Sequence, residues 1–309
     1  MRIIYAGIFL LTVSVQFVRA QGCSDAGFCT AGAMQAADNT IDNAKVKKSW
    51  GISLTSGYGE NGTLVIAPQA EGSMKIGKRG TLDAKLPLNI ATGKLGSHIS
   101  IGDLIAGYSN YFFSGLSKWQ CQATMGARIG LGDAGAEYKG MPLPMPYQSG
   151  LGTTDFIAGV NVAYDGHITF AVGYQQPLIQ YNRNGYIPST VYPAVANDND
   201  YFASRWLRRK GDVLLRIEGN WRYRMWSFAG GPLLIYHLGE DNVILSNGNS
   251  LSLKGSDGLT LNLVGSLSYS FSNARMHLLA GTPLLVRDYR PDGLTRALVI
   301  TLRYTHNKM

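Results

Sequence analysis

Residues 258–272 read GLTLNLVGSLSYSFS, and this stretch decides the fold. Successive side chains of a β-strand point to opposite faces. One face therefore carries leucines and aromatic rings from Leu259 to Phe271, and the other carries Thr260, Asn262 and a series of serines. A strand of a soluble domain is usually about 5–6 residues long, whereas a barrel strand that crosses a membrane needs about 9–11 residues with apolar side chains outward and polar ones inward. The stretch predicts a strand of a transmembrane β-barrel.

The same alternation recurs along most of the chain. It predicts an all-β fold, a transmembrane antiparallel up-and-down β-barrel of about 12 strands, with 14 as the alternative count. An even number of strands closes such a barrel and leaves no strand edge without a hydrogen-bonding partner in lipid. A secreted β-sandwich, with its apolar faces turned inward, is the soluble alternative. The predicted strands are residues 50–57, 63–76, 80–90, 97–112, 119–131, 151–165, 167–178, 211–223, 224–238, 258–272, 275–287 and 294–304.

The connections between the predicted strands are alternately short and long. Asp165-Gly166 is a two-residue hairpin signal, whereas long links occupy residues 132–150, 179–210, 239–257 and 288–293. Outer-membrane barrels have short periplasmic turns and longer external loops. The pattern predicts that both ends of the barrel lie on the periplasmic side, in the bacterial outer membrane.

The N-terminal residues predict export. A positively charged start is followed by an apolar run over residues 3–15 and by Val18-Arg19-Ala20. This is the pattern of a secretory signal peptide over residues 1–20, with an N-terminal anchor helix as the alternative. Residues 21–49 lack strand alternation and are predicted to form an N-terminal periplasmic plug, or hatch. Residues 50–309 are predicted to form the barrel.

Composition agrees with a barrel. The chain has 309 residues, including 38 glycines and 17 tyrosines, and only 16% of its residues are charged. No stretch approaches the roughly 18 consecutive apolar residues that would predict a membrane-spanning helix. The formal net charge of +8 suits contact with anionic membrane lipid, including lipopolysaccharide. Nucleic acid is excluded as a partner because an exported chain does not meet it and no basic motif recurs.

Three cysteines, Cys23, Cys29 and Cys121, follow the predicted cleavage site. Cys23 and Cys29 could close a small disulfide ring, and either could instead pair with Cys121. Cys23 could also belong to a lipoprotein signal, although Gln21 stands where a small residue is expected. We predict no metal and no cofactor: zinc needs more ligands than this spacing offers, and the Met–Pro segment at residues 140–146 holds only two thioethers for Cu(I).

Charged residues on the polar faces of the strands are expected to line the lumen. Arg or Lys on the lipid face at the bilayer midplane costs about 2–4 kcal/mol, so an inward placement is strongly favoured. Two interpretations remain open, a salt-bridge network that fills and stiffens the barrel and a polar conduit. The predicted lumen-lining residues are Asp83, Lys85, Asp103, Arg128, Asp155, Arg216, Glu218, Arg222 and Arg303.

The link at residues 179–210 is long for a connection without secondary structure, and such loops are usually functional. Its aromatic residues could receive an apolar ligand at the external surface, and its basic residues could bind lipid phosphates. Anchoring at the membrane interface and docking of partner proteins are the alternatives. The candidate contact residues are Tyr186, Tyr192, Tyr201, Phe202, Trp206, Arg208 and Arg209.

The sequence holds no clear catalytic constellation. The phospholipase family of outer-membrane barrels has a His-x-Ser-Asn stretch, and the nearest match here, His98-Ile99-Ser100-Ile101, lacks the Asn. An outer-membrane protease of the omptin type requires paired acidic groups and an Asp–His pair at the external rim, and no stretch of the sequence matches this pattern clearly. We therefore predict that the protein is not an enzyme.

Three stretches resemble the outer-membrane family named for the meta-pathway of phenol degradation, a relative of the FadL-type transporters of hydrophobic compounds. They are Ile101-Gly102-Asp103-Leu104, Gly150-Leu151-Gly152-Thr153-Thr154-Asp155 and Arg290-Pro291-Asp292-Gly293-Leu294-Thr295-Arg296. The resemblance covers residues 50–304 loosely. It implies a channel for small hydrophobic or amphipathic molecules whose N-terminal segment gates the lumen. The chain departs from the FadL type in having fewer predicted strands and a short hatch. The alternative function is a non-transporting barrel subunit of a larger outer-membrane protein complex, which docks partners through its external loops.

Overall fold

The computed structural model describes residues 47–113, 118–188, 201–293 and 296–308 of the chain. The predicted signal peptide and nearly all of the predicted plug therefore lie outside the described residues, as do Cys23, Cys29 and Tyr192. The first strand starts at Lys48, two residues before the predicted start of the barrel at residue 50.

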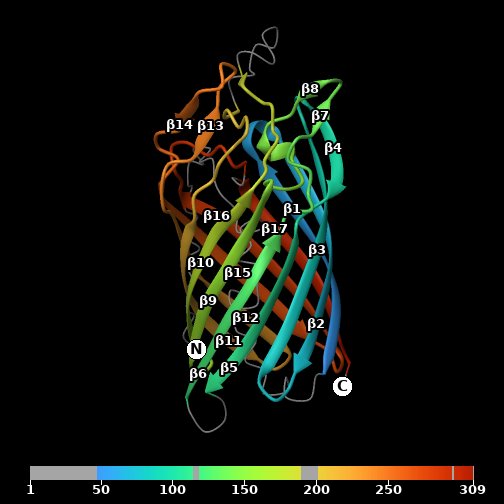
Figure 1. Cartoon of the computed structure of the whole chain (residues 1–309). Helices are drawn as coiled ribbons and strands as arrows, with labels where there is room; N and C mark the ends of the chain where they lie inside the picture. The colour runs from blue at the N-terminus through green and yellow to red at the C-terminus, as the bar shows by residue number, and fades with distance from the viewer. Residues whose placement is uncertain (1–46, 114–117, 189–200, 294–295, 309) are drawn as a thin grey trace, which may run out of the picture.

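Twelve antiparallel strands close into a barrel, and one further short strand, β4 (Gly96–Ile101), extends the sheet (Figure 1). The barrel closes where the first and last strands pair, from Lys48 opposite Lys308 to Gly59 opposite Arg296. The predicted fold class and the count of 12 are confirmed. The barrel strands are β1 (Lys48–Gly59), β2 (Leu64–Ile76), β3 (Gly80–Gly93), β5 (Leu104–Phe113), β6 (Trp119–Ile129), β9 (Thr153–Tyr164), β10 (Ile168–Gln180), β11 (Asp212–Tyr223), β12 (Trp226–His237), β15 (Gly258–Ser270), β16 (Ala274–Leu285) and β17 (Arg296–Lys308).

Short turns and long loops lie at opposite ends of the barrel. The described chain enters β1 and leaves β17 at the short-turn end (Figure 1), which is the periplasmic end of an outer-membrane barrel. The predicted Asp165-Gly166 hairpin is found there, and both residues have positive φ, 51° and 69°. Two successive positive φ angles define the type I′ turn that suits the twist of a two-residue hairpin.

The predicted strand at residues 97–112 is interrupted at Gly102-Asp103. β4 pairs with the external half of β3, whereas β5 pairs with its periplasmic half and with β6. A side chain at Gly102 would bring a Cβ within 2.7 Å of Asn89 Nδ2 and Pro87 Cγ, so this position needs glycine. The prediction of one continuous strand was wrong because alternation alone does not reveal such a break.

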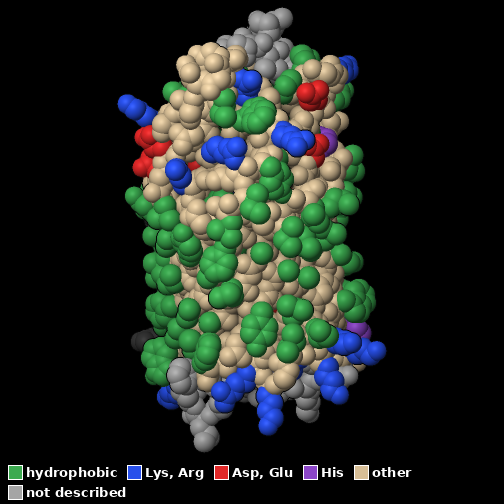
Figure 2. Space-filling view, in the orientation of Figure 1, with side chains coloured by type: hydrophobic (Ala, Val, Ile, Leu, Met, Phe, Trp, Pro, Cys, Tyr) green, Lys and Arg blue, Asp and Glu red, His purple; other side chains and the backbone are tan. Residues whose placement is uncertain are grey.

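The outer surface carries a belt of apolar side chains around the middle of the barrel, and Lys and Arg gather above and below it (Figure 2). On β15, Leu263 is 49% exposed, whereas Asn262, on the opposite face, is 1% exposed. Thr260 and Val264 are also buried. The predicted orientation of this strand is confirmed, with leucines outward and the polar face inward.

Aromatic pairs lie near the periplasmic ends of neighbouring strands. The rings of Trp226 and Tyr269 are 4.7 Å apart, as are those of Trp119 and Tyr164. The ring centroids of Trp50 on β1 and Tyr304 on β17 lie 6.1 Å apart. Aromatic girdles of this kind mark the interface between the hydrocarbon and the headgroups in membrane barrels. Together with the apolar belt, they define a transmembrane barrel.

The long external loops fold over the mouth of the barrel. Their regular elements are the hairpins β7 (Glu137–Tyr138)–β8 (Met141–Pro142) and β13 (Asn242–Ile244)–β14 (Ser250–Ser252), and the 3-10 turns η3 (Glu60–Gly62) and η4 (Met145–Tyr147). We call these folded loops the cap. None of the helical turns in the described residues is long and apolar enough to cross a bilayer.

Candidate functional site: the lumen and its external cap

The lumenal wall formed by β9 to β15 carries an apolar patch. Its members are buried side chains on the inward faces of five consecutive barrel strands, and they pack against one another. They are Ile157, Ala171, Leu214, Leu233, Ile235 and Val264. We call this set the lumenal apolar patch. It departs from the expectation of a uniformly polar lumen.

Polar and charged side chains lie on the external side of this patch. Along β9, Asp155 stands two residues before Ile157, and it is fully buried. Gln175 on β10 donates an amide hydrogen bond of 2.5 Å to one Asp155 oxygen. Asp212 on β11 lies opposite Gln175 in register, and His237 on β12 lies opposite Asp212.

A second polar layer lies on the periplasmic side of the patch. Arg216 and Glu218, two residues apart on β11, form a buried ion pair. Asn161 on β9 lies on this side as well, whereas Asn262 on β15 lies opposite Leu233, on the external side of Val264. Asn161 and Asn262 are 3% and 1% exposed, and neither amide has a hydrogen-bonding partner among the described residues. Along β9 and β11, from the external end toward the periplasmic end, the lumenal side chains are therefore first acidic, then apolar, then polar or charged.

The opposite wall of the lumen carries charges as well. Glu71 on β2 accepts hydrogen bonds from Arg303 (3.0 Å) and Ser53 (2.8 Å), and Lys85 lies 3.9 Å away. Asp83 is half-buried on the same face of β3, whereas Arg222 is exposed near the periplasmic end of β11. Arg303, Lys85, Arg216 and Glu218 thus lie inside the barrel, and Arg222 lies at its periplasmic rim.

Asp103 and Arg128 join the cap to the barrel wall. Arg128 Nε donates to Asp103 at 2.8 Å, and the backbone N–H groups of Gly132 (3.0 Å) and Leu151 (3.4 Å) also reach Asp103. Both charged side chains are buried. Asp103 stands at the strand break and holds both ends of the loop at residues 130–152. A cavity of about 30 Å³ borders Arg128, Leu151 and Asp292, which is room for a water molecule.

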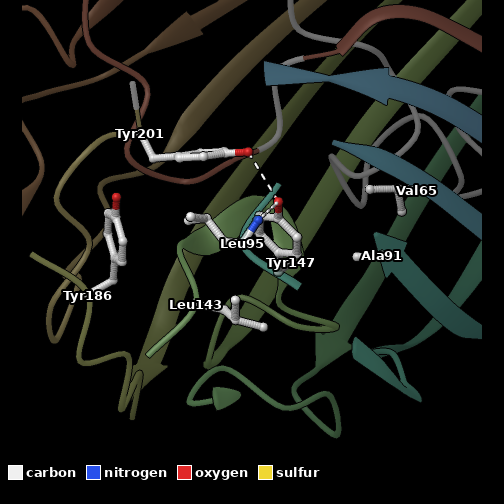
Figure 3. Packing of buried hydrophobic residues seen from close by; sticks show 7 residues of the cluster. All are labelled: Val65, Ala91, Leu95, Leu143, Tyr147, Tyr186 and Tyr201. Carbon is white, nitrogen blue, oxygen red and sulfur yellow. Dashed lines mark hydrogen bonds between the residues drawn. The ribbon is translucent and has the colours of Figure 1, made fainter. Parts of the chain in front are cut away.

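An apolar cluster, built largely around tyrosines, forms one part of the cap (Figure 3). Tyr147 and Tyr201 lie with their hydroxyl oxygens 3.1 Å apart, and Tyr147 accepts a 3.2 Å hydrogen bond from the backbone of Leu95. Tyr201 also contacts the Thr63 hydroxyl at 3.0 Å. Burial raises the pKa of Tyr201, which keeps its hydroxyl neutral. Tyr186 completes the cluster with an edge-on contact to Tyr201.

A chain of ion pairs ties the cap to the ends of the strands. Arg209 bonds to both Asp212 (3.2 Å) and Asp292 (3.3 Å). His237 contacts Asp212 at 2.7 Å through one ring nitrogen and Asp241 at 2.8 Å through the other. Burial alone would lower the pKa of Arg209, but its carboxylate neighbours raise it above the ordinary value.

A further pair, Arg290–Glu60 at 3.0 Å, links the last external loop to the first one. Arg287 joins the same loop to itself through Asp292 at 3.0 Å. All four of these side chains are buried. Four loops and the turn after β1 therefore share one interlocked cap.

The loop at residues 181–211 uses its candidate contact residues differently from the prediction. Tyr186 and Tyr201 are buried inside the cap and do not present a receiving surface. Phe202 packs on Tyr289 with ring centroids 4.4 Å apart. Arg209 is buried in ion pairs, so it does not reach lipid phosphates. The sequence pattern could not show that other loops supply the packing partners of these aromatic rings and one of the two carboxylates that bind Arg209.

The remaining predicted residues have simpler placements. Trp206 and Arg208 are exposed. Cys121 on β6 carries a free thiol, and its alternative disulfide partners Cys23 and Cys29 lie outside the described residues, so the pairing stays a prediction. His98 and Ser100 lie on β4, and His98 faces Asp133 at 3.7 Å. Met145 of the Met–Pro segment is buried in the cap.

Comparison with known proteins supports this description of the fold. No protein-family description and no curated protein matches the chain. Among solved structures, the chain is similar to an outer-membrane channel from Pseudomonas putida F1, with a TM-score of 0.56 and 13% sequence identity over 85% of this chain and 96% of that one. A Pseudomonas aeruginosa FadL homologue gives a TM-score of 0.41 and 11% identity over 94% and 99% of the two chains. The monoaromatic hydrocarbon channel CymD gives 0.40 and 10% identity over 90% and 93%.

The first similarity shows a shared fold. The closed barrel, its apolar belt and its aromatic girdle define an outer-membrane β-barrel, and the bacterial outer membrane is its location. The closer relationship to the phenol meta-pathway family stays a prediction.

Proposed function

We propose that this barrel is an outer-membrane channel for small amphipathic molecules. The observation that carries the proposal is the lumenal wall, where the lumenal apolar patch lies between an acidic layer and a layer with Arg216, Glu218 and Asn161. A uniformly polar lumen would favour ions and sugars, and a uniformly apolar one would stay dry. A wall with both characters suits a molecule with an apolar body and a polar group. No covalent chemistry is involved.

We further propose that the N-terminal segment gates the lumen from the periplasmic side. The described chain enters the barrel at Lys48, beside the last strand, at the short-turn end. The residues between the predicted cleavage site and residue 46 are thus tethered at the periplasmic mouth. A segment of this length tethered there has the reach to enter the lumen, since extended chain spans about 3.3 Å per residue.

Planar-bilayer conductance tests the proposal. The mature chain is compared with a variant lacking residues 21–46, which leaves β1 intact because this strand starts at Lys48. The channel proposal expects larger or more frequent openings in the variant, together with faster entry of small amphipathic solutes into liposomes. Equal silence of both proteins, with both barrels folded, would refute gated transport.

A sealed barrel that docks partner proteins is the second candidate. It is favoured by one observation, the interlocked cap, whose loops are fixed by buried ion pairs and a tyrosine cluster. A rigid external surface is suited to binding a partner. Silent bilayers, together with specific proteins that co-purify with the barrel and are lost when Trp206 and Arg208 are substituted, would favour this second candidate.

A further inference from the structure

Asp155 is a buried carboxylate without a cationic partner among the described residues. Its side chain is fully buried, and one of its oxygens accepts the amide hydrogen bond from Gln175. The other oxygen, Oδ1, has no hydrogen-bonding partner among the residues that the structure describes. Burial of a carboxylate is unfavourable unless it is paired and hydrogen-bonded. Only one of the two carboxylate oxygens of Asp155 is therefore hydrogen-bonded among the described residues.

Two arginines on neighbouring elements direct hydrogen bonds to other carboxylates. Arg128, opposite Asp155 in register, directs its Nε to Asp103 at 2.8 Å. Arg209 is near enough to interact electrostatically with Asp155, but its hydrogen bonds go to Asp212 and Asp292. The other buried acids of this layer, Asp212 and Asp241, both contact His237. Asp155 differs from them in having its negative charge uncompensated by a bonded cation.

The groups beside Asp155 add acceptors. Gln175 Oε1 and Thr153 Oγ1 are buried and have no hydrogen-bonding partner in the described part of the chain. Thr153 lies two residues from Asp155 on the same face of β9, and Gln175 is bonded to Asp155 directly. An ammonium group offers three donors and a positive charge, which matches a carboxylate oxygen flanked by an amide oxygen and a hydroxyl.

The lumenal surface becomes apolar two residues further along β9, toward the periplasmic end. Ile157 and Leu214 belong to the lumenal apolar patch and lie on the periplasmic side of Asp155 and Asp212. We propose that Asp155 and Gln175 bind the ammonium group of a small organic cation, whose apolar part lies on the lumenal apolar patch. This inference rests on the proposed channel function and specifies its solute class.

Titration of the purified mature barrel in detergent with butylammonium chloride tests the inference. The heat of binding is measured at constant ionic strength, and 1-butanol and sodium butyrate serve as neutral and anionic probes of the same size. We expect butylammonium to bind at least about tenfold more tightly than either one, the ratio that corresponds to one charge-assisted hydrogen bond.

Two matched variants locate the site. Asp155→Asn keeps the shape of the side chain and removes its charge, and it is expected to weaken butylammonium binding by about tenfold or more. Asp165→Asn makes the same change in the exposed periplasmic turn and is expected to leave binding unchanged. If Asp155→Asn does not fold, Gln175→Leu replaces it, with a smaller expected loss in the same direction.

The outcomes are distinct. Equal binding of butylammonium and 1-butanol would overturn the inference, as would equal loss in the two Asn variants. The result is also separable from channel function. Asp155-dependent binding in a barrel that never conducts would keep the site and refute transport, whereas conduction without such binding would keep the channel and refute the site.

Discussion

Replacing Asp103 by Ala tests how the cap is held to the barrel. The substitution removes the carboxylate that accepts the hydrogen bond of Arg128 Nε, and Arg128 is just 6% exposed. Removing one partner of a buried ion pair costs about 3–5 kcal/mol, because the other charge stays buried. The backbone N–H of Gly132, at 3.0 Å, loses a charged acceptor as well. The contact from Leu151, at 3.4 Å, is too long to add much.

The expected loss of about 3–5 kcal/mol is measured by reversible urea unfolding of the barrel in lipid vesicles, followed by tryptophan fluorescence. Arg128→Ala and the double variant complete a thermodynamic cycle. If Arg128 and Asp103 act as a pair, the double variant loses less than the sum of the single losses by about 1.5–3 kcal/mol. A loss of stability below about 1 kcal/mol for Asp103→Ala, which is the range of a surface ion pair, would refute the view that Asp103 holds the cap to the barrel. Strict additivity of the two single losses in the double variant would refute it as well.

Three further predictions address orientation, backbone packing and the ion network. Leu263→Arg, on the lipid face, is expected to lower the free energy of unfolding by about 2–4 kcal/mol in the same urea assay. Ser266→Arg, on the lumenal face, is expected to be nearly as stable as the wild type. A larger loss for Ser266→Arg than for Leu263→Arg would contradict the assigned faces. Gly132→Ala places a Cβ 2.7 Å from facing backbone and is expected to lose about 1–3 kcal/mol, while Gly72→Ala, with open space around it, should not; equal melting temperatures would contradict this. His237→Leu leaves two buried carboxylates without their shared partner, so limited proteolysis should cut the external loops faster than in the wild type, and unchanged protection would count against the network.

The barrel was predictable because lipid imposes the same rule on every strand. A spanning strand must turn apolar side chains outward and satisfy all its backbone groups with neighbours, so alternation over residues 258–272 already states which face meets lipid. The turn at Asp165-Gly166 was equally readable, since positive φ angles favour these residues. The break at Gly102-Asp103 was not readable, because it depends on contacts from a loop at residues 130–152 that the local pattern does not contain.

The site was predictable only in part, and for a related reason. Arg216 and Glu218 lie inside the barrel because the lipid face excludes them, which is a local argument. The partners of Arg209, by contrast, come from strand and loop residues up to 83 positions away. No spacing rule connects such residues. The external aromatics were likewise assigned to a surface, whereas Tyr186 and Tyr201 pack inward because rings of this size stabilise a cap by their burial.

The lumenal apolar patch follows from a limit on what alternation can show. Where both faces of a strand are apolar, as in Leu214-Leu215 of β11 and Leu233-Leu234 of β12, the pattern loses its contrast and the inward apolar residue is hidden among outward ones. A barrel built only to be filled would gain by pairing all its lumenal charges, since a half-satisfied polar group costs more than an apolar one. This lumen instead keeps six apolar side chains in contact. Beside them, Asp155, Asn161 and Asn262 have side-chain atoms without a hydrogen-bonding partner in residues 47–113, 118–188, 201–293 and 296–308. This combination would be unfavourable in a lumen whose side chains only fill the barrel. It suits the proposed channel, because an amphipathic solute can contact the apolar side chains and bond to the unpartnered polar atoms.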